Sequence, residues 1–168
     1  MTLSMYQASV PVFVRTLANL SHVLGKGAEH AKAKSVSDEV LLQTRLIPDM
    51  LPLVRQVQIA CDMACRASAR LAGAEPQSFE DTETTMEQVQ ARIARATDYI
   101  KTFTAAQIDG SETREVVIKT RDGDQKLDGQ SYLLHFVLPN VFFHCTTAYN
   151  ILRKSGVEIG KGDFIGQA

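Results

Sequence analysis

Apolar residues recur along most of the chain with a period close to 3.6, which is typical of amphipathic helices. The first stripe starts at Tyr6, and Pro11 within it is expected to kink the helix or to delay its start. Gly25 and Gly27 weaken the pattern, yet the helix-favouring residues after them predict continuation to about Lys34. The stripe consists of Tyr6, Val10, Phe13, Leu17, Leu20 and Leu24. We therefore expect one long N-terminal helix.

A second helical stretch follows a break at residues 35–40. We expect it to start near Asp49, which can cap or charge the first turn, where Pro52 is still tolerated. Gly73 should end it, because glycine is favoured just beyond a helix C-terminus. Its expected core residues are Leu53, Val57, Ala60 or Cys61, Ala64 and Leu71.

A third helix is expected after a loop that reaches from Gly73 to Asp81. It should open at Thr82 or Thr84 and run to about Ala105. The acidic residues Glu83 and Glu87 would then lie at its positive end, where the helix dipole stabilises negative charge.

The helical period is interrupted once, between Val116 and Leu127. A β-branched run at 116–118 is followed by Asp122-Gly123 and a second short extended stretch, which is typical of a β-hairpin. Because one hairpin cannot form an independent sheet, we expect it to be appended to the helices.

A fourth helix is expected from about Ser131 to Ser155, bent at Pro139 and closed by Gly156. The glycine-rich tail after it should pack Phe164 and Ile165 back onto the helices. Four long helical stretches without a βαβ rhythm predict an all-α fold, a four-helix bundle that forms a single domain over residues 1–168.

Composition and charge narrow the class of protein. The chain has 168 residues and is 45% apolar, which suits one domain with a full core. The 18 basic and 19 acidic residues give no electrostatic reason to expect a nucleic-acid partner. No membrane-spanning stretch or cleavable leader is recognisable, so we expect a cytoplasmic protein. Cys61, Cys65 and Cys145 are an odd number and are expected to be small, buried, reduced thiols.

The stretch "PNVFFHCTTAY" places two polar residues, Asn140 and His144, on an apolar stripe of the fourth helix. At spacing i, i+4 they share one face. An unpaired buried polar group costs roughly 1 to 3 kcal/mol, so each side chain needs a partner from another helix, a water, a ligand or a metal ion. The stripe consists of Leu133, Val137, Asn140, His144, Thr147 and Ile151. The simplest interpretation is a satisfied core pair that fixes helix register.

Other polar features are expected to be structural or solvated. This holds for the remaining histidines, for an exposed polar face on the second helix and for the "FEDTETTMEQ" stretch. "GVEIGKGDFIG" lacks the spacing and the Ser or Thr of a phosphate-binding loop. The residues concerned are His22, His30 and His135, with Gln58, Asp62 and Arg66 forming the polar face.

Three stretches carry a resemblance to a known family: "PDMLPLVRQVQIACDMA", "RLAGAEPQSFEDTE" and, above all, "YLLHFVLPNVFFHCTTAYNILRKSGVEIGKGDFIG". The chain resembles an uncharacterised bacterial family of domain-of-unknown-function proteins in the DinB/YfiT-like superfamily of metal-dependent four-helix bundles. The resemblance runs from Met5 to Gly166. It implies an up-down-down-up bundle, often a homodimer, with a pocket between the helices.

In better-known members of this superfamily, three histidines bind zinc or nickel, one from the second helix and two from an H-x-x-x-H on the fourth. Some members are thiol-dependent transferases or isomerases. Here His144 matches the second histidine of the pair, whereas Asn140 and Gln56 stand where the other two would be. One imidazole and two amides are poor ligands for these ions, so the resemblance implies a degenerate site with weak divalent-metal binding at most.

Two functions remain open. In one, the protein is a non-catalytic bundle in which Gln56, Asn140 and His144 form a polar network or bind a small molecule in an interhelical pocket. In the other, it is a metal-dependent transferase or hydrolase that uses His144, either with or without a thiol cofactor. Because the second and fourth helices are apolar over more than one stripe, we also expect a homodimer through helices.

Overall fold

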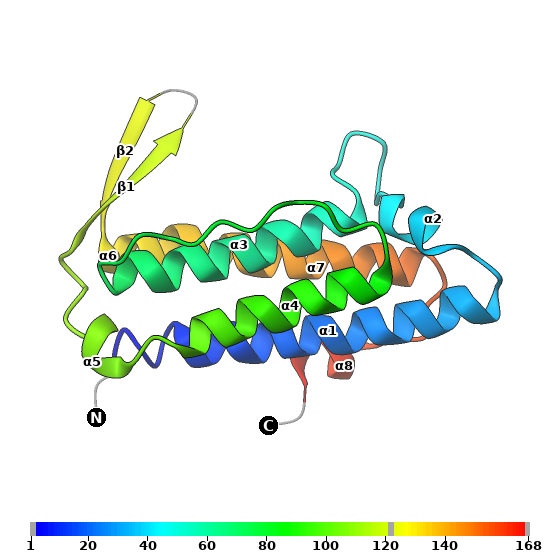
Figure 1. Cartoon of the computed structure of the whole chain (residues 1–168), viewed down its shortest axis with the longest axis horizontal. Coiled ribbons are helices and arrows are strands. Elements are labelled where there is room, and N and C mark those ends of the chain that lie inside the picture. Colours follow the sequence, from blue (N-terminus) through cyan, green and yellow to red (C-terminus); the bar gives the residue numbers. More distant parts are fainter. Residues whose placement is uncertain (1–2, 121–122, 167–168) are drawn as a thin grey trace.

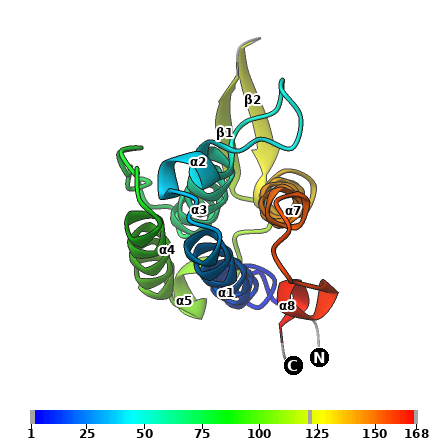
Figure 2. The same ribbon diagram turned by 90° about the vertical axis from the view of Figure 1, so that its right-hand side faces the viewer.

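Four long helices run along a common axis in the computed structural model, which describes residues 3–120 and 123–166. Helices α1 and α7 run in one direction, and α3 and α4 run in the other (Figure 1). The end-on view shows the four helices side by side around one core (Figure 2). They span Val10–Ala33 (α1), Leu53–Leu71 (α3), Met86–Lys101 (α4) and Leu138–Lys154 (α7). The expected up-down-down-up four-helix bundle is therefore confirmed.

The observed helix termini follow local capping chemistry. Helix α1 starts late, with Pro11 in its first turn, where the missing N–H costs nothing. Helix α3 starts only after Pro52, later than expected. Thr85 and Gln88 form a reciprocal capping box at the start of α4, which therefore begins later than Thr82 or Thr84.

Three short helices were not expected. Helix α2 (Asp38–Gln43) lies within and just beyond the predicted break, and Ser37 caps it by accepting from the Val40 N–H. Helix α5 (Ala105–Ile108) follows α4, which ends at Lys101 and not near Ala105. Helix α8 (Lys161–Ile165) lies in the C-terminal tail, where Phe164 packs edge-on against Tyr149 while Ile165 stays half exposed.

The connection from α3 to α4, residues 72–85, runs back along the whole bundle (Figure 1). Two consecutive helices that point the same way need such a crossover. Gly73 starts it with φ +72°, a conformation that favours glycine, and so ends α3 as expected.

The expected hairpin is present. Strand β1 (Glu115–Thr120) pairs antiparallel with β2 (Gly123–Asp128), and Val117 lies opposite Lys126. Asp122 of the expected turn lies outside the described residues. Val116 and Ile118 are buried, whereas β2 is almost entirely exposed, so only one side of β1 belongs to the core.

The last helical segment changes its winding before Pro139. A short α-helical turn, α6 (Gly129–Ser131), leads into a π-helix, η1 (Tyr132–Val137), in which the Leu138 N–H bonds to the Leu133 carbonyl. Proline has no N–H, and its ring clashes with the carbonyl four residues earlier. The wider π-turn accommodates both effects, so a change of winding accompanies the proline at which we expected a bend.

The core fills the space between the four long helices. It contains the expected stripe of α3 and that of α1 from Val10 to Leu24, whereas Tyr6 lies before α1 and is half-buried. All three cysteines are buried and free, as expected. Within the described residues, no helix combines the length and the apolar character needed to cross a bilayer.

Candidate functional site

A hydrogen bond between Gln56 and His144 joins α3 to α7. His144 Nδ1 lies 2.7 Å from Gln56 Oε1. Only 1% of Gln56 is exposed, and its Nε2 donates to the Leu51 carbonyl at 2.9 Å. Two of the three expected site residues therefore meet, and both ends of the Gln56 amide are used within the fold.

Asn140, the third expected site residue, binds its own helical segment. Its Nδ2 donates to the Phe136 carbonyl at 2.6 Å, one turn earlier. In the described part of the chain, no hydrogen bond links it to Gln56 or His144. Asn140 therefore stabilises the turn around Pro139, where the helix changes its winding.

The Gln56 contact sets the protonation of the His144 ring. Because Gln56 Oε1 can only accept, the neutral imidazole carries its proton on Nδ1. Burial lowers the pKa of His144 below its usual value of 6.5, so the ring is neutral near pH 7. Nε2 then has a free lone pair, and it has no hydrogen-bonding partner among the residues that the structure describes. The half-buried ring stands edge-on to Phe143.

These residues do not fit a zinc or nickel site as they are arranged. The Gln56 oxygen is already the acceptor for His144, and the Asn140 amide is bound to Phe136. One neutral imidazole remains, without charged ligands beside it. Over residues 3–120 and 123–166, no group of three or more His, Cys, Asp or Glu side chains could hold a metal ion.

The cysteines do not supply a nucleophile. Burial raises the pKa of Cys145 to about 12, and burial together with the charge of Asp62 raises the pKa of Cys65 to about 12. Burial also raises the pKa of Cys61 well above its usual value. Because the thiolate is the reactive form, these groups behave as apolar core side chains.

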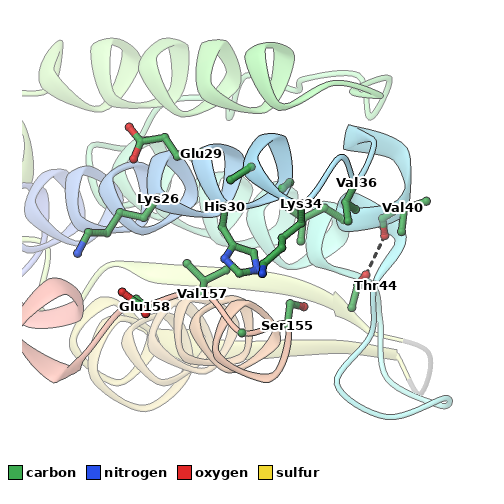
Figure 3. A pocket seen from close by; sticks show the side chains of 14 residues that line it. Lys26, Glu29, His30, Lys34, Val36, Val40, Thr44, Ser155, Val157 and Glu158 are labelled. Atoms are coloured by element: carbon green, nitrogen blue, oxygen red, sulfur yellow. Dashed lines mark hydrogen bonds between the residues drawn. The ribbon is translucent and has the colours of Figure 1, made fainter.

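An open hollow lies where the C-terminal half of α1, helix α2 and the turn after α7 meet (Figure 3). Its volume is ≈ 980 Å³, at the upper end of the range for small-molecule sites. We call it the α1–α7 hollow. Its apolar lining combines the buried Ala31, Leu41 and Val157 with the exposed Val36 and Val40.

The polar groups of the α1–α7 hollow are unevenly placed. His30 and Lys34 point toward the side on which Ser155 and Val157 lie, whereas Glu29 points to the other side of α1 (Figure 3). The expected pocket residues Gln56, Asn140 and His144 do not line this hollow.

The remaining histidines differ in their exposure. His22 is exposed and bonds to Asp163 at 2.9 Å, and His135 is exposed. His30, which was expected to be structural or solvated, is half-buried and lines the α1–α7 hollow next to Gly156.

A buried arginine, Arg92 of α4, is the centre of a polar network that the sequence analysis missed. Its guanidinium Nη2 lies 2.7 Å from Asp62 and 3.0 Å from Asp81, and Nη1 lies 3.1 Å from Glu83. Nη1 also donates to the Glu80 carbonyl at 2.9 Å. Burial alone would lower the pKa of Arg92, but the hydrogen bonds and charges of Glu83 and Asp62 outweigh it and raise that pKa. The guanidinium is therefore a permanent cation inside the fold.

This network contradicts two expectations. The polar face on α3 is largely buried, because only 4% of Gln58 and 16% of the Asp62 side chain are accessible, and of the three only the Arg66 side chain, at 43%, is exposed. The "FEDTETTMEQ" stretch is not simply solvated either, since the Glu83 side chain is only 5% accessible. The crossover of residues 72–85 covers these groups as it returns along the bundle. One sequence signal could have revealed this: Arg92 falls on the apolar stripe of α4, and a buried arginine requires carboxylates.

Comparisons with known proteins agree with this fold. A family model described as a domain of unknown function, DUF1993, matches residues 5–165. The crystal structure of a DinB family member protein from Shewanella denitrificans is similar, with a TM-score of 0.89 and 37% sequence identity over 97% of this chain and 92% of that one. No curated protein matches the chain. The chain thus belongs to the DUF1993 family of domains of unknown function, and its four-helix bundle is that of a DinB-like protein.

Proposed function

We propose that this protein is a small-molecule-binding bundle whose ligand occupies the α1–α7 hollow. The observation that carries the proposal is the hollow itself, whose size and largely apolar lining suit a small organic molecule. In this proposal the Gln56–His144 pair is a structural connection between α3 and α7. The amide of Gln56 supports that role, because both of its ends are already bonded within the fold.

We assign to the ligand an apolar body with an anionic end group that lies at Lys34, although Glu158 also lines the hollow, beside Val157 (Figure 3). Val36 and Val40 leave apolar surface open beside the buried Leu41 and Val157. Lys34 supplies a positive charge next to them (Figure 3). The other lysine of the lining, Lys26, is bound to Asp163 at 2.8 Å. Lys34 is therefore the cation that we assign to the ligand.

A fluorescence titration with 1-anilinonaphthalene-8-sulfonate, an aromatic anion, tests the proposal. We expect one saturable site per chain, competed by octanoate. Lys34→Glu should weaken binding about tenfold, because it replaces an attractive charge by a repulsive one. Lys32→Glu is the matched control, since Lys32 is exposed on the same helix and does not line the hollow. Equal affinity in both variants would refute the site.

The residues Gln56, Asn140 and His144 remain the second place to look for a ligand. Repeating the titration with His144→Ala separates the two sites. Unchanged affinity supports the α1–α7 hollow and the structural role of the pair. A loss confined to His144→Ala would instead place the ligand at the Gln56–His144 pair.

A transferase or hydrolase that uses His144 is the second candidate function. The neutral ring with a free Nε2 favours it, because such an imidazole can accept a proton from a substrate. Elemental analysis of protein purified without chelator tests the metal-dependent form. We expect less than one zinc or nickel ion per chain. A stoichiometric ion that is lost in His144→Ala would favour the enzyme.

The proposal places the protein in a reducing compartment such as the cytoplasm. Three buried free thiols without a disulfide among them support this placement. Thiol counting on protein denatured directly from cell extract tests it, with three reactive thiols per chain expected.

A further inference from the structure

The hairpin of β1 and β2 has an open edge along β1. The two strands form a two-stranded sheet that projects from the end of the bundle opposite the α1–α7 hollow (Figure 1). A two-stranded hairpin is marginal by itself, and an open edge presents backbone groups that can pair with another strand. The question is which strand fits this edge.

The register decides which backbone groups of β1 point outward. Thr120 pairs with Gly123 across two intervening residues, and such a closing pair exchanges both of its N–H···O bonds. Hydrogen-bonded and non-bonded pairs alternate along an antiparallel ladder. Ile118 and Val116 therefore bond to β2, and the backbone groups of Lys119, Val117 and Glu115 point to the open edge.

The outward residues are complementary to a second copy of themselves. If β1 pairs antiparallel with β1 of another chain around Val117, Glu115 of each copy lies opposite Lys119 of the other. Val117, which is 39% exposed, then meets its own copy, and Val116 meets Ile118 on the opposite face. Opposite charges across a strand pair stabilise it. Within the hairpin Lys119 already lies opposite Asp124, and Glu115 lies 3.2 Å from Lys126. The second copy would therefore add an opposite charge on the open side of each residue.

We propose that two copies of this chain associate through their β1 edges and form a symmetric four-stranded antiparallel sheet centred on Val117. The sheet order is β2, β1, β1 of the partner and β2 of the partner. Because strand pairing alone buries little area, the dimer is weak, with a dissociation constant on the order of 0.1 to 1 mM. The proposal is independent of the ligand in the α1–α7 hollow and replaces the expected dimer through helices.

Sedimentation equilibrium of the full chain, extended to about 1 mM, provides the first test. Val117→Pro removes the central outward N–H without removing a β1–β2 hydrogen bond, so it should abolish association while the hairpin remains. Val117→Thr keeps that N–H and should still associate. Circular dichroism checks that both variants fold.

Charge exchange provides the second test. Glu115→Lys and Lys119→Glu should each raise the dissociation constant about tenfold, because each creates two like-charge pairs. The double variant restores opposite charges and should regain most of the wild-type affinity. Lys32→Glu makes the same charge change at an exposed position of α1, away from the hairpin, and serves as the control that leaves the edge pairs intact.

Three outcomes would overturn the proposal. The first is a wild-type chain that stays monomeric over the whole concentration range. The second is a double charge variant that is not rescued. The third is a dimer that survives Val117→Pro but dissociates in Phe143→Glu, because Phe143 is 55% exposed on α7 and would report a dimer through helices.

Discussion

Arg92 shows how one residue can organise a distant part of the chain. Its side chain has no exposed surface, yet it contacts carboxylates of α3 and of the crossover. A buried charge is tolerated only when it is paired and hydrogen-bonded. The carboxylates therefore stabilise the buried guanidinium, and the guanidinium in turn attaches the crossover to α4. Its Nε is the exception, since it has no hydrogen-bond partner within the described residues.

We expect Arg92→Met to lower the free energy of unfolding by about 3 to 5 kcal/mol, because Asp62 and Glu83 would lose their buried partner. Urea unfolding at pH 7 measures the change. Arg95→Met is the matched control. The Arg95 side chain is 58% exposed and only 3.8 Å from Glu83, so its loss should cost no more than about 1 kcal/mol. Similar costs for both variants would show that the network contributes little.

His144 gives the stability a dependence on pH. Its pKa is lowered below 6.5 by burial, so the unfolded chain binds a proton more readily than the folded chain between the two pKa values. The contribution of the neutral ring is therefore present above about pH 6.5 and is lost as pH falls through the folded pKa. We expect wild type to be more stable than His144→Gln at about pH 7.5. This difference in stability should shrink as the pH is lowered to about 5. Thermal unfolding measures the difference, and a constant value would contradict the prediction.

At the scale of elements, close packing and local propensity compete inside α1. Gly25 and Gly27 both weaken the helix, but their surroundings differ. A methyl group on Gly25 would meet nothing within 4 Å, whereas one on Gly27 would lie 2.7 Å from Leu152 Cδ2 of α7. Gly27 therefore allows α1 and α7 to approach, and Gly25 has no such role.

The two glycines give a matched pair of variants. Gly25→Ala should stabilise the protein by about 0.5 to 1 kcal/mol, because alanine restricts the unfolded chain and favours the helix. Gly27→Ala should be less stable than Gly25→Ala by at least about 1 kcal/mol, because Leu152 is buried and must move. Chemical unfolding compares them. Equal gains would mean that α1 and α7 do not pack closely at this point.

At the scale of the whole molecule, the crossover is fastened to the bundle by a small number of polar contacts. Asp81 links it to the core by contacts to Arg92 and Arg55, and Tyr99 accepts a hydrogen bond from the Gln77 N–H. The Asp81 side chain is 37% exposed, in contrast to the buried Glu83. Its contacts can therefore open without exposing the core.

We expect Asp81→Asn to loosen the crossover while the free energy of unfolding falls by no more than about 1 kcal/mol. Digestion with a glutamyl endopeptidase measures the loosening, since the crossover contains Glu75, Glu80 and Glu83. Cleavage there should accelerate severalfold. Asp124→Asn in the hairpin is the control and should leave the crossover cleavage unchanged.

The amino-acid sequence by itself determined the helical class, the position of the hairpin and the ends of α3 and α7, near Gly73 and Gly156. These features depend on hydrophobic period, on β-branched runs and on glycine conformations, all of which are local. The pairing of Gln56 with His144 followed from the family resemblance, and the structure supplied its hydrogen bond. The π-turn before Pro139 was visible in advance only as a bend.

Only the tertiary structure decided where the polar residues lie. The sequence pattern predicted that Asp62 and Glu83 are solvated. The i, i+4 spacing of polar residues carries no information about the crossover that covers them in the fold. Asn140 and His144 share one stripe, yet Asn140 binds its own backbone and His144 binds α3. The α1–α7 hollow joins residues from three separate segments. Burial and partnership of a polar group depend on segments far away in sequence, and hydrophobic periodicity carries no information about them.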